Sequence, residues 1–136
     1  MIKLIGIIIV GHGEFAKGLI SSVDVIAGEQ KYLQGVEFRL DHSTEDLENN
    51  IKKKIETMKE CSGLLFLTDI VGGTPFKTCV LLSQDIKNSK VLSGVNLSIL
   101  LEAIMQKNTK DIEALKENII KIGKEGIVSF DLKEMK

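Results

Sequence analysis

Residues Leu4 to Gly13 read Leu-Ile-Gly-Ile-Ile-Ile-Val-Gly-His-Gly, an aliphatic run that ends in a histidine between two glycines. A continuous aliphatic run of this length is typical of a parallel β-strand that is covered on both faces. The run is far too short to span a bilayer, and no small-residue cleavage site of a signal peptide follows it. We therefore predict a strand of the mature protein, with His12 at its carboxyl end.

Strand-like and helix-like segments alternate from this first strand to the end of the chain. Aliphatic runs or alternating apolar residues predict further strands over residues 36–40, 63–67, 91–95 and 127–130. Apolar residues at helical spacing predict helices in the segments 15–26, 47–58, 74–83, 97–105 and 112–122. Polar residues that can cap a helix mark where the last four of these begin: Ser43 or Thr44, Thr74 (followed by Pro75), Asn96 and Thr109.

This alternation predicts an α/β fold, with residues 1–136 forming one domain around an open, mostly parallel sheet with helices on both faces. The first and third strands are apolar throughout, whereas the second alternates with charged residues, as an edge strand does. The strand order 2-1-3-4 fits this best, with a short extra strand at Ile127–Phe130. In that order a crevice opens between the carboxyl ends of strands one and three, where ligands of open α/β sheets bind.

The composition is that of an ordinary globular protein, with 43% hydrophobic and 27% charged residues. Eighteen basic and 19 acidic side chains give a formal net charge of −1, which argues against binding to nucleic acid or to an anionic membrane. Cys61 and Cys79 show no CxxC spacing and have apolar neighbours, so we predict reduced core thiols in a reducing, cytoplasmic compartment.

His12 and Asp69 are the candidate catalytic residues, because they follow the two strands that border the predicted crevice. Taken alone, each has an ordinary structural explanation, packing for the histidine and a turn for the aspartate. Together they suggest a phosphohistidine site. An aspartate that accepts a hydrogen bond from Nδ1–H would fix the tautomer of the ring and leave Nε2 as the nucleophile.

Gly72-Gly73-Thr74-Pro75 is the third part of the candidate site. Glycines at the start of a helix expose backbone N–H groups, and the helix dipole favours an anion there. Thr74 adds a hydroxyl that caps the helix or contacts a phosphate. A simple turn between strand and helix would show the same residues, but their coincidence with His12 and Asp69 favours a phosphohistidine site.

Three segments carry a family resemblance: residues 4–13, residues 66–76 (Phe-Leu-Thr-Asp-Ile-Val-Gly-Gly-Thr-Pro-Phe) and residues 94–97 (Gly-Val-Asn-Leu). They resemble the IIA component of the mannose-type (mannose, fructose, sorbose, N-acetylgalactosamine) phosphoenolpyruvate-dependent sugar phosphotransferase system. The resemblance extends over almost the whole chain in strand order and spacing. The mannose-specific member has an aromatic residue where this chain has Ile70-Val71, which leaves the sugar open.

The resemblance implies a phosphotransferase component in which His12 accepts a phosphoryl group from phospho-HPr and Asp69 orients its ring. It also implies that Gly72, Gly73 and Thr74 form the cradle of the phosphoryl group. A IIB protein, expected on a separate polypeptide, would then receive the group, and the membrane components IIC and IID would take part only indirectly. Family members are dimers that can exchange their last strand, a role that Ile127–Phe130 could fill. We expect no metal and no organic cofactor, since phosphoryl transfer needs mainly positioning and charge stabilisation.

Two other functions fit parts of the sequence. Residues 11–16 (Gly-His-Gly-Glu-Phe-Ala) match the G-x-G-x-x-A dinucleotide fingerprint, and Asp41 lies where its ribose-binding acid is expected. The first alternative is therefore a small nucleotide-binding module, but this interpretation gives no role to Asp69 or to the Gly-Gly-Thr-Pro loop. The second alternative is a regulatory domain of the same fold that is phosphorylated by HPr and signals through a partner.

Overall fold

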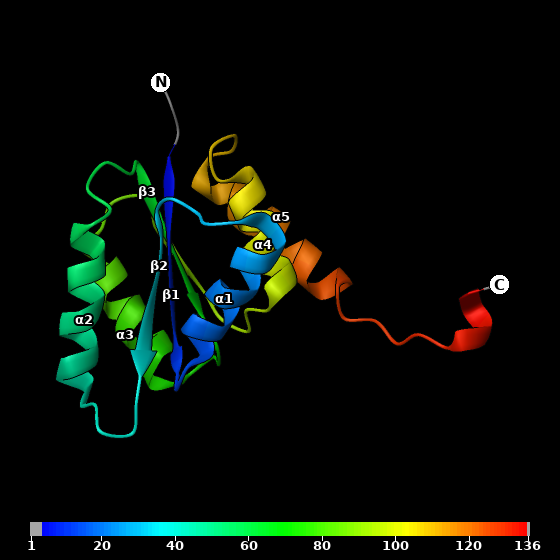
Figure 1. Ribbon diagram of the computed structural model, residues 1–136. Helices are drawn as coiled ribbons and strands as arrows, with labels where there is room; N and C mark the ends of the chain where they lie inside the picture. Colours follow the sequence, from blue (N-terminus) through cyan, green and yellow to red (C-terminus); the bar gives the residue numbers. More distant parts are fainter. Residues whose placement is uncertain (1–3, 136) are drawn as a thin grey trace.

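The computed structural model describes residues 4–135 and contains one four-stranded sheet (Figure 1). All neighbouring strands are parallel, and their order is β2-β1-β3-β4, as the sequence predicts. The strands are β1 (Ile5–His12), β2 (Leu33–Phe38), β3 (Gly63–Thr68) and β4 (Ser89–Leu92). β1 and β3 lie in the middle, so their carboxyl ends meet at the predicted crevice.

Five helices cover the two faces of this sheet (Figure 1). One apolar cluster joins one face of the sheet to α1 (Phe15–Ala27), α4 (Leu97–Gln106) and α5 (Ile112–Glu125). A second cluster joins the opposite face to α2 (Thr44–Glu56) and α3 (Thr74–Ser83). Successive residues of β1 enter alternate clusters, because side chains alternate between the faces of a strand: Ile7 and Ile9 pack in the first, Ile8 and Val10 in the second.

Local sequence signals fix where several helices begin. Ser43 forms a capping box with Asp46 at the start of α2, and the Asn96 side chain accepts a hydrogen bond from the Ile99 N–H at the start of α4. Other predicted boundaries shift by a few residues. Gly73 rather than Thr74 is the N-cap of α3, and Asp111 rather than Thr109 is the N-cap of α5.

The two edge strands also differ in extent from the prediction. β2 begins at Leu33 and ends at Phe38, so Leu40 lies beyond it and is fully exposed. β4 ends at Leu92, three residues before the predicted end at Val95. Within residues 4–135 no helix is long and apolar enough to cross a membrane.

The predicted strand at Ile127–Phe130 is wrong for this structure. The segment follows α5 and leads away from the sheet to a short 3₁₀ helix, Leu132–Met135 (Figure 1). Its apolar side chains Ile127, Val128 and Phe130 are between 66% and 77% exposed. A strand requires a neighbour to accept and donate its backbone hydrogen bonds, and in the described chain this segment pairs with no strand.

Candidate functional site

His12 is the last residue of β1 and projects from the carboxyl edge of the sheet. Gly13 follows with φ +57°, a left-handed conformation that glycine adopts without steric cost and that turns the chain sharply toward α1. The His12 side chain remains 47% exposed, even though the residues before it in β1 are buried. The strand therefore presents an imidazole to solvent from a rigid base.

Asp69, the first residue after β3, lies directly beside this imidazole. Its Oδ2 atom is 2.8 Å from Nδ1 of His12 and also accepts a hydrogen bond from the His12 backbone N–H at 2.7 Å. Its Oδ1 atom accepts from the Ile70 N–H at 2.9 Å. The structure thus brings together the two predicted catalytic residues, which are 57 positions apart in the sequence.

Hydrogen bonding keeps the Asp69 carboxylate ionised. Its side chain is only 9% exposed, and burial by itself raises the pKa of the carboxyl group. The hydrogen bonds from His12 and Ile70 outweigh that effect, so the pKa lies below its ordinary value. Because an ionised carboxylate only accepts hydrogen bonds, Nδ1 of His12 carries the proton, and Nε2 of a neutral ring has a free lone pair.

Gly73 lies close to the Cε1 edge of the imidazole. A Cβ atom at this position would be 3.0 Å from Cε1 of His12 and 3.3 Å from the Ile70 carbonyl oxygen, so the close approach suits glycine. Gly73 is also the N-cap of α3, which places the amino end of that helix next to the ring. Its own N–H donates to the Ile70 carbonyl at 3.2 Å.

Gly72 and Thr74, the other two residues of the predicted cradle, lie on either side of Gly73, the one in the turn and the other as the first residue of α3. Gly72 has φ +83°, which forms the turn into α3, and an added Cβ there would meet no atom within 4 Å. Thr74 is the first residue of α3, and its carbonyl oxygen accepts a hydrogen bond from the Thr78 hydroxyl. Because Gly73 is the N-cap of α3 and no side chain among the described residues caps this helix, the Thr74 hydroxyl does not cap it, and a contact with a phosphate remains its predicted role.

Phe38 is a further neighbour of the imidazole, and the sequence analysis missed it. It is the last residue of β2 and lies opposite His12 in the parallel register of the two strands. The ring centroids are 5.9 Å apart, at an interplanar angle of 64°. The sequence does predict that the second strand ends beside the first, where His12 lies. It predicts this end at Leu40 instead of Phe38, however, so Phe38 does not stand out as the residue next to His12.

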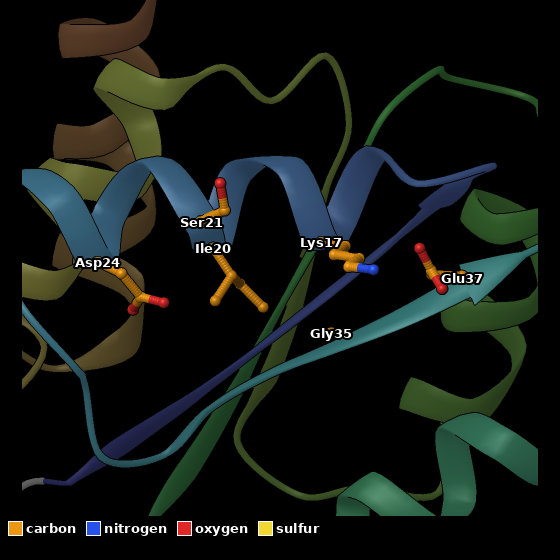
Figure 2. A pocket seen from close by; sticks show the side chains of 6 residues that line it. All are labelled: Lys17, Ile20, Ser21, Asp24, Gly35 and Glu37. Atoms are coloured by element: carbon orange, nitrogen blue, oxygen red, sulfur yellow. The ribbon is translucent and has the colours of Figure 1, made fainter.

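A groove of about 420 Å³ lies between α1 and the edge strand β2 (Figure 2). Its lining residues are Lys17, Ile20, Ser21, Asp24, Gly35 and Glu37. The Oε2 atom of Glu37 is buried and has no hydrogen-bond partner in residues 4–135, whereas Oε1 accepts from Arg39 at 2.7 Å. None of the lining residues belongs to the predicted site, so this groove is a separate feature of the sheet edge.

Comparison with known proteins matches this chain to one family. Residues 6–120 match the family model EIIA-man, described as "PTS system fructose IIA component". The fructose-specific EIIA component of Bacillus subtilis is 31% identical over 116 residues, which cover 85% of this chain and 80% of that protein. The sorbose-specific EIIA component of Lacticaseibacillus casei is 31% identical over 127 residues, which cover 93% of this chain and 91% of that protein.

A longer relative and a solved structure extend this comparison. The mannose-specific EIIAB component of Escherichia coli K12 is 27% identical over 130 residues, and the match spans 95% of this chain but only 40% of that protein. The crystal structure of the phosphotransferase system component EIIA from Streptococcus agalactiae superimposes with a TM-score of 0.87 at 38% identity. That match covers 93% of this chain and 98% of the other.

Proposed function

The chain belongs to the EIIA-man family of sugar phosphotransferase system IIA components. We therefore propose that it is a phosphocarrier that carries a phosphoryl group on His12. The donor is phospho-HPr and the acceptor is a IIB protein. The sugar is bound by the membrane components IIC and IID and does not contact this chain. The proposal places the protein in the cytoplasm, where both soluble partners act.

The hydrogen bond between Nδ1 of His12 and Asp69 is the observation that carries this proposal. With the proton held on Nδ1, the Nε2 lone pair attacks the phosphorus atom of the donor phosphohistidine. The new N–P bond forms as the donor's N–P bond breaks, and the electron pair of the broken bond returns to the donor nitrogen. The His12 ring becomes more positive during this step, and the ionised Asp69 stabilises that charge.

The amino end of α3 supports the proposal as an anion site for the transferred group. N–H groups in the first turn of a helix have no carbonyl partner within the helix, and the helix dipole is positive there. In α3 the available N–H groups are those of Thr74 and Phe76, because Pro75 has none and Gly73 donates to Ile70. We assign the phosphate cradle to these two N–H groups, the Thr74 hydroxyl and the open backbone at Gly72 and Gly73.

The exposed carboxyl-terminal segment supports a homodimer. Ile127, Val128 and Phe130 are exposed in the single chain, and β4 is an edge strand of the sheet. Exposed apolar residues in an extended segment are suited to pair with the free edge of another sheet. We propose that this segment pairs with β4 of a second copy, which would give it the strand conformation that its sequence predicts.

Phosphorylation of purified protein tests the proposed function. The protein is incubated with phosphoenolpyruvate, enzyme I and HPr, and the modified residue is mapped by mass spectrometry at neutral or alkaline pH. We expect one phosphoryl group on His12, no modification of His12→Ala, and unchanged modification of His42→Ala, which serves as the matched control because His42 is the only other histidine. Modification of the His12→Ala protein at another residue would refute the assignment.

A further inference from the structure

Phe38 contacts the site through both its ring and its backbone. The Phe38 ring meets the His12 ring edge to face, at a centroid separation of 5.9 Å, within the range that favours such pairs. Its carbonyl oxygen accepts a hydrogen bond from the Gly13 N–H at 2.8 Å. The same residue therefore holds the imidazole and the backbone turn that follows it.

The Phe38 ring is itself held by the core. It packs against the apolar cluster under α2 and α3, to which Val10 of β1 and Val36 of β2 belong. Phe38 ends β2 directly opposite His12, and the two strands are joined by the backbone hydrogen bonds of the sheet. A contact made from such a base restricts the imidazole more than a side chain on a free loop would.

A hydrogen bond at Nδ1 alone does not fix the plane of the imidazole, because the terminal side-chain torsion of histidine has a broad energy profile. The structure supplies two further contacts, with Gly73 close to Cε1 and Phe38 at the ring. Together with the hydrogen bond from Nδ1 to Asp69, these contacts limit the rotation of the ring from three directions. The His12 side chain is nevertheless 47% exposed, which leaves the ring open to an incoming protein.

We propose that Phe38 is a positioning residue for phosphoryl transfer, because it fixes the plane of the His12 ring and so directs Nε2 toward the phosphorus atom of the incoming protein. This inference rests on the proposed function of His12. Phe38 contacts neither the phosphoryl group nor the partner in this role. Its loss is expected to slow transfer without weakening the encounter between the two proteins.

Phe38→Leu and Phe38→Tyr test the proposal in single-turnover transfer from phospho-HPr. Phe38→Leu keeps an apolar side chain but removes the aromatic contact, so the maximal rate should fall about three- to tenfold. The phospho-HPr concentration that gives half the maximal rate should not change. Phe38→Tyr keeps the ring and should retain the wild-type rate. Leu33→Ala, at the buried start of the same strand, is the control for general destabilisation. Its folded molecules should transfer the phosphoryl group at the wild-type maximal rate.

A second measurement does not depend on the proposed function. The NMR signals of the His12 ring report its orientation and tautomer in the absence of any partner. Phe38→Leu should shift these signals and reduce the share of the Nδ1–H tautomer, whereas Leu33→Ala should leave both unchanged. Unchanged His12 signals in Phe38→Leu would overturn the positioning role even if the wild type is never phosphorylated. In the transfer experiment, a higher half-saturating concentration of phospho-HPr at an unchanged maximal rate would make Phe38 a docking residue. This result would also overturn the positioning role.

Discussion

Oδ2 of Asp69 accepts two hydrogen bonds from His12, one from Nδ1 at 2.8 Å and one from the backbone N–H at 2.7 Å. His12 ends β1 and Asp69 directly follows β3, and in these neighbouring parallel strands Val10 of β1 lies opposite Thr68 of β3. The pair therefore joins the ends of the two central strands and at the same time sets the tautomer of the histidine. Any change in this carboxylate is expected to affect transfer more than folding.

Asp69→Asn is expected to slow phosphoryl transfer about 10²-fold, the scale that misplacement of a reacting group by about 1 Å produces. Three N–H groups point at the two carboxylate oxygens, and an amide offers one oxygen in place of two. The hydrogen bond at Nδ1 or the one at Ile70 must then be lost. Single-turnover labelling measures the rate, and circular dichroism checks the fold. A rate equal to that of the wild type would remove Asp69 from the mechanism.

Acid is expected to abolish the contribution of Asp69 to stability. Burial alone would raise the pKa of this carboxyl group, but hydrogen bonds from His12 and Ile70 hold it below the ordinary value of 3.8. The stabilisation is therefore complete above the unfolded-state pKa and is lost as the pH falls through the lower folded-state pKa. Urea unfolding gives the difference in free energy of unfolding between the wild type and Asp69→Asn. This difference should shrink as the pH drops below about 4; an unchanged difference between pH 5 and pH 2.5 would contradict the argument.

The two glycines before α3 are expected to respond differently to alanine. In Gly73→Ala the new Cβ would lie 3.0 Å from Cε1 of His12, so the half-exposed ring must shift and transfer should slow about tenfold. In Gly72→Ala the space is open but φ is +83°, so the expected effect is a loss of about 1 kcal/mol in the free energy of unfolding.

Urea unfolding and single-turnover labelling of both glycine variants separate the two effects. Gly73→Ala should change mainly the transfer rate, and Gly72→Ala mainly the stability. The opposite assignment, with Gly72→Ala slow in transfer and Gly73→Ala as fast as the wild type, would mean that the close approach of Gly73 to the ring has no role in transfer.

Removal of residues 127–136 is expected to leave the fold of the single chain intact, because Ile127, Val128 and Phe130 are exposed. If this segment pairs with a second copy, the truncated protein should be monomeric where the full chain is dimeric. Light scattering coupled to size-exclusion chromatography measures the mass of both proteins. A truncated protein that is still dimeric would place the dimer interface elsewhere.

The sequence predicted the centre of the fold better than its edges. Ile5–Val10 and Gly63–Leu67 contain no polar residue, which is the pattern of a strand covered on both faces. Their positions in the order 2-1-3-4 then brought His12 and Asp69 to one edge of the sheet. The predicted proximity followed from strand order alone, because parallel neighbours end at the same edge.

The errors arose where tertiary pairing overrides local preference. Ile127–Phe130 has the residues of a strand, but strand formation depends on a partner that the local sequence does not specify. Phe38 was missed because its contact with His12 depends on the exact end of β2 and on the register between two strands. The cap of α3 moved from Thr74 to Gly73, a shift of one residue, which is the usual uncertainty of helix ends.

The identity of the phosphorylated nitrogen tests the central claim most directly. A His42→Gln protein labelled with ¹⁵N-histidine contains His12 as its single histidine, and long-range ¹H–¹⁵N correlation spectra recorded after phosphorylation distinguish its two ring nitrogens. The account predicts a phosphoryl group on Nε2 and a proton on Nδ1, where Asp69 accepts it. A phosphoryl group on Nδ1 would contradict the account, since that atom would then no longer donate to the carboxylate.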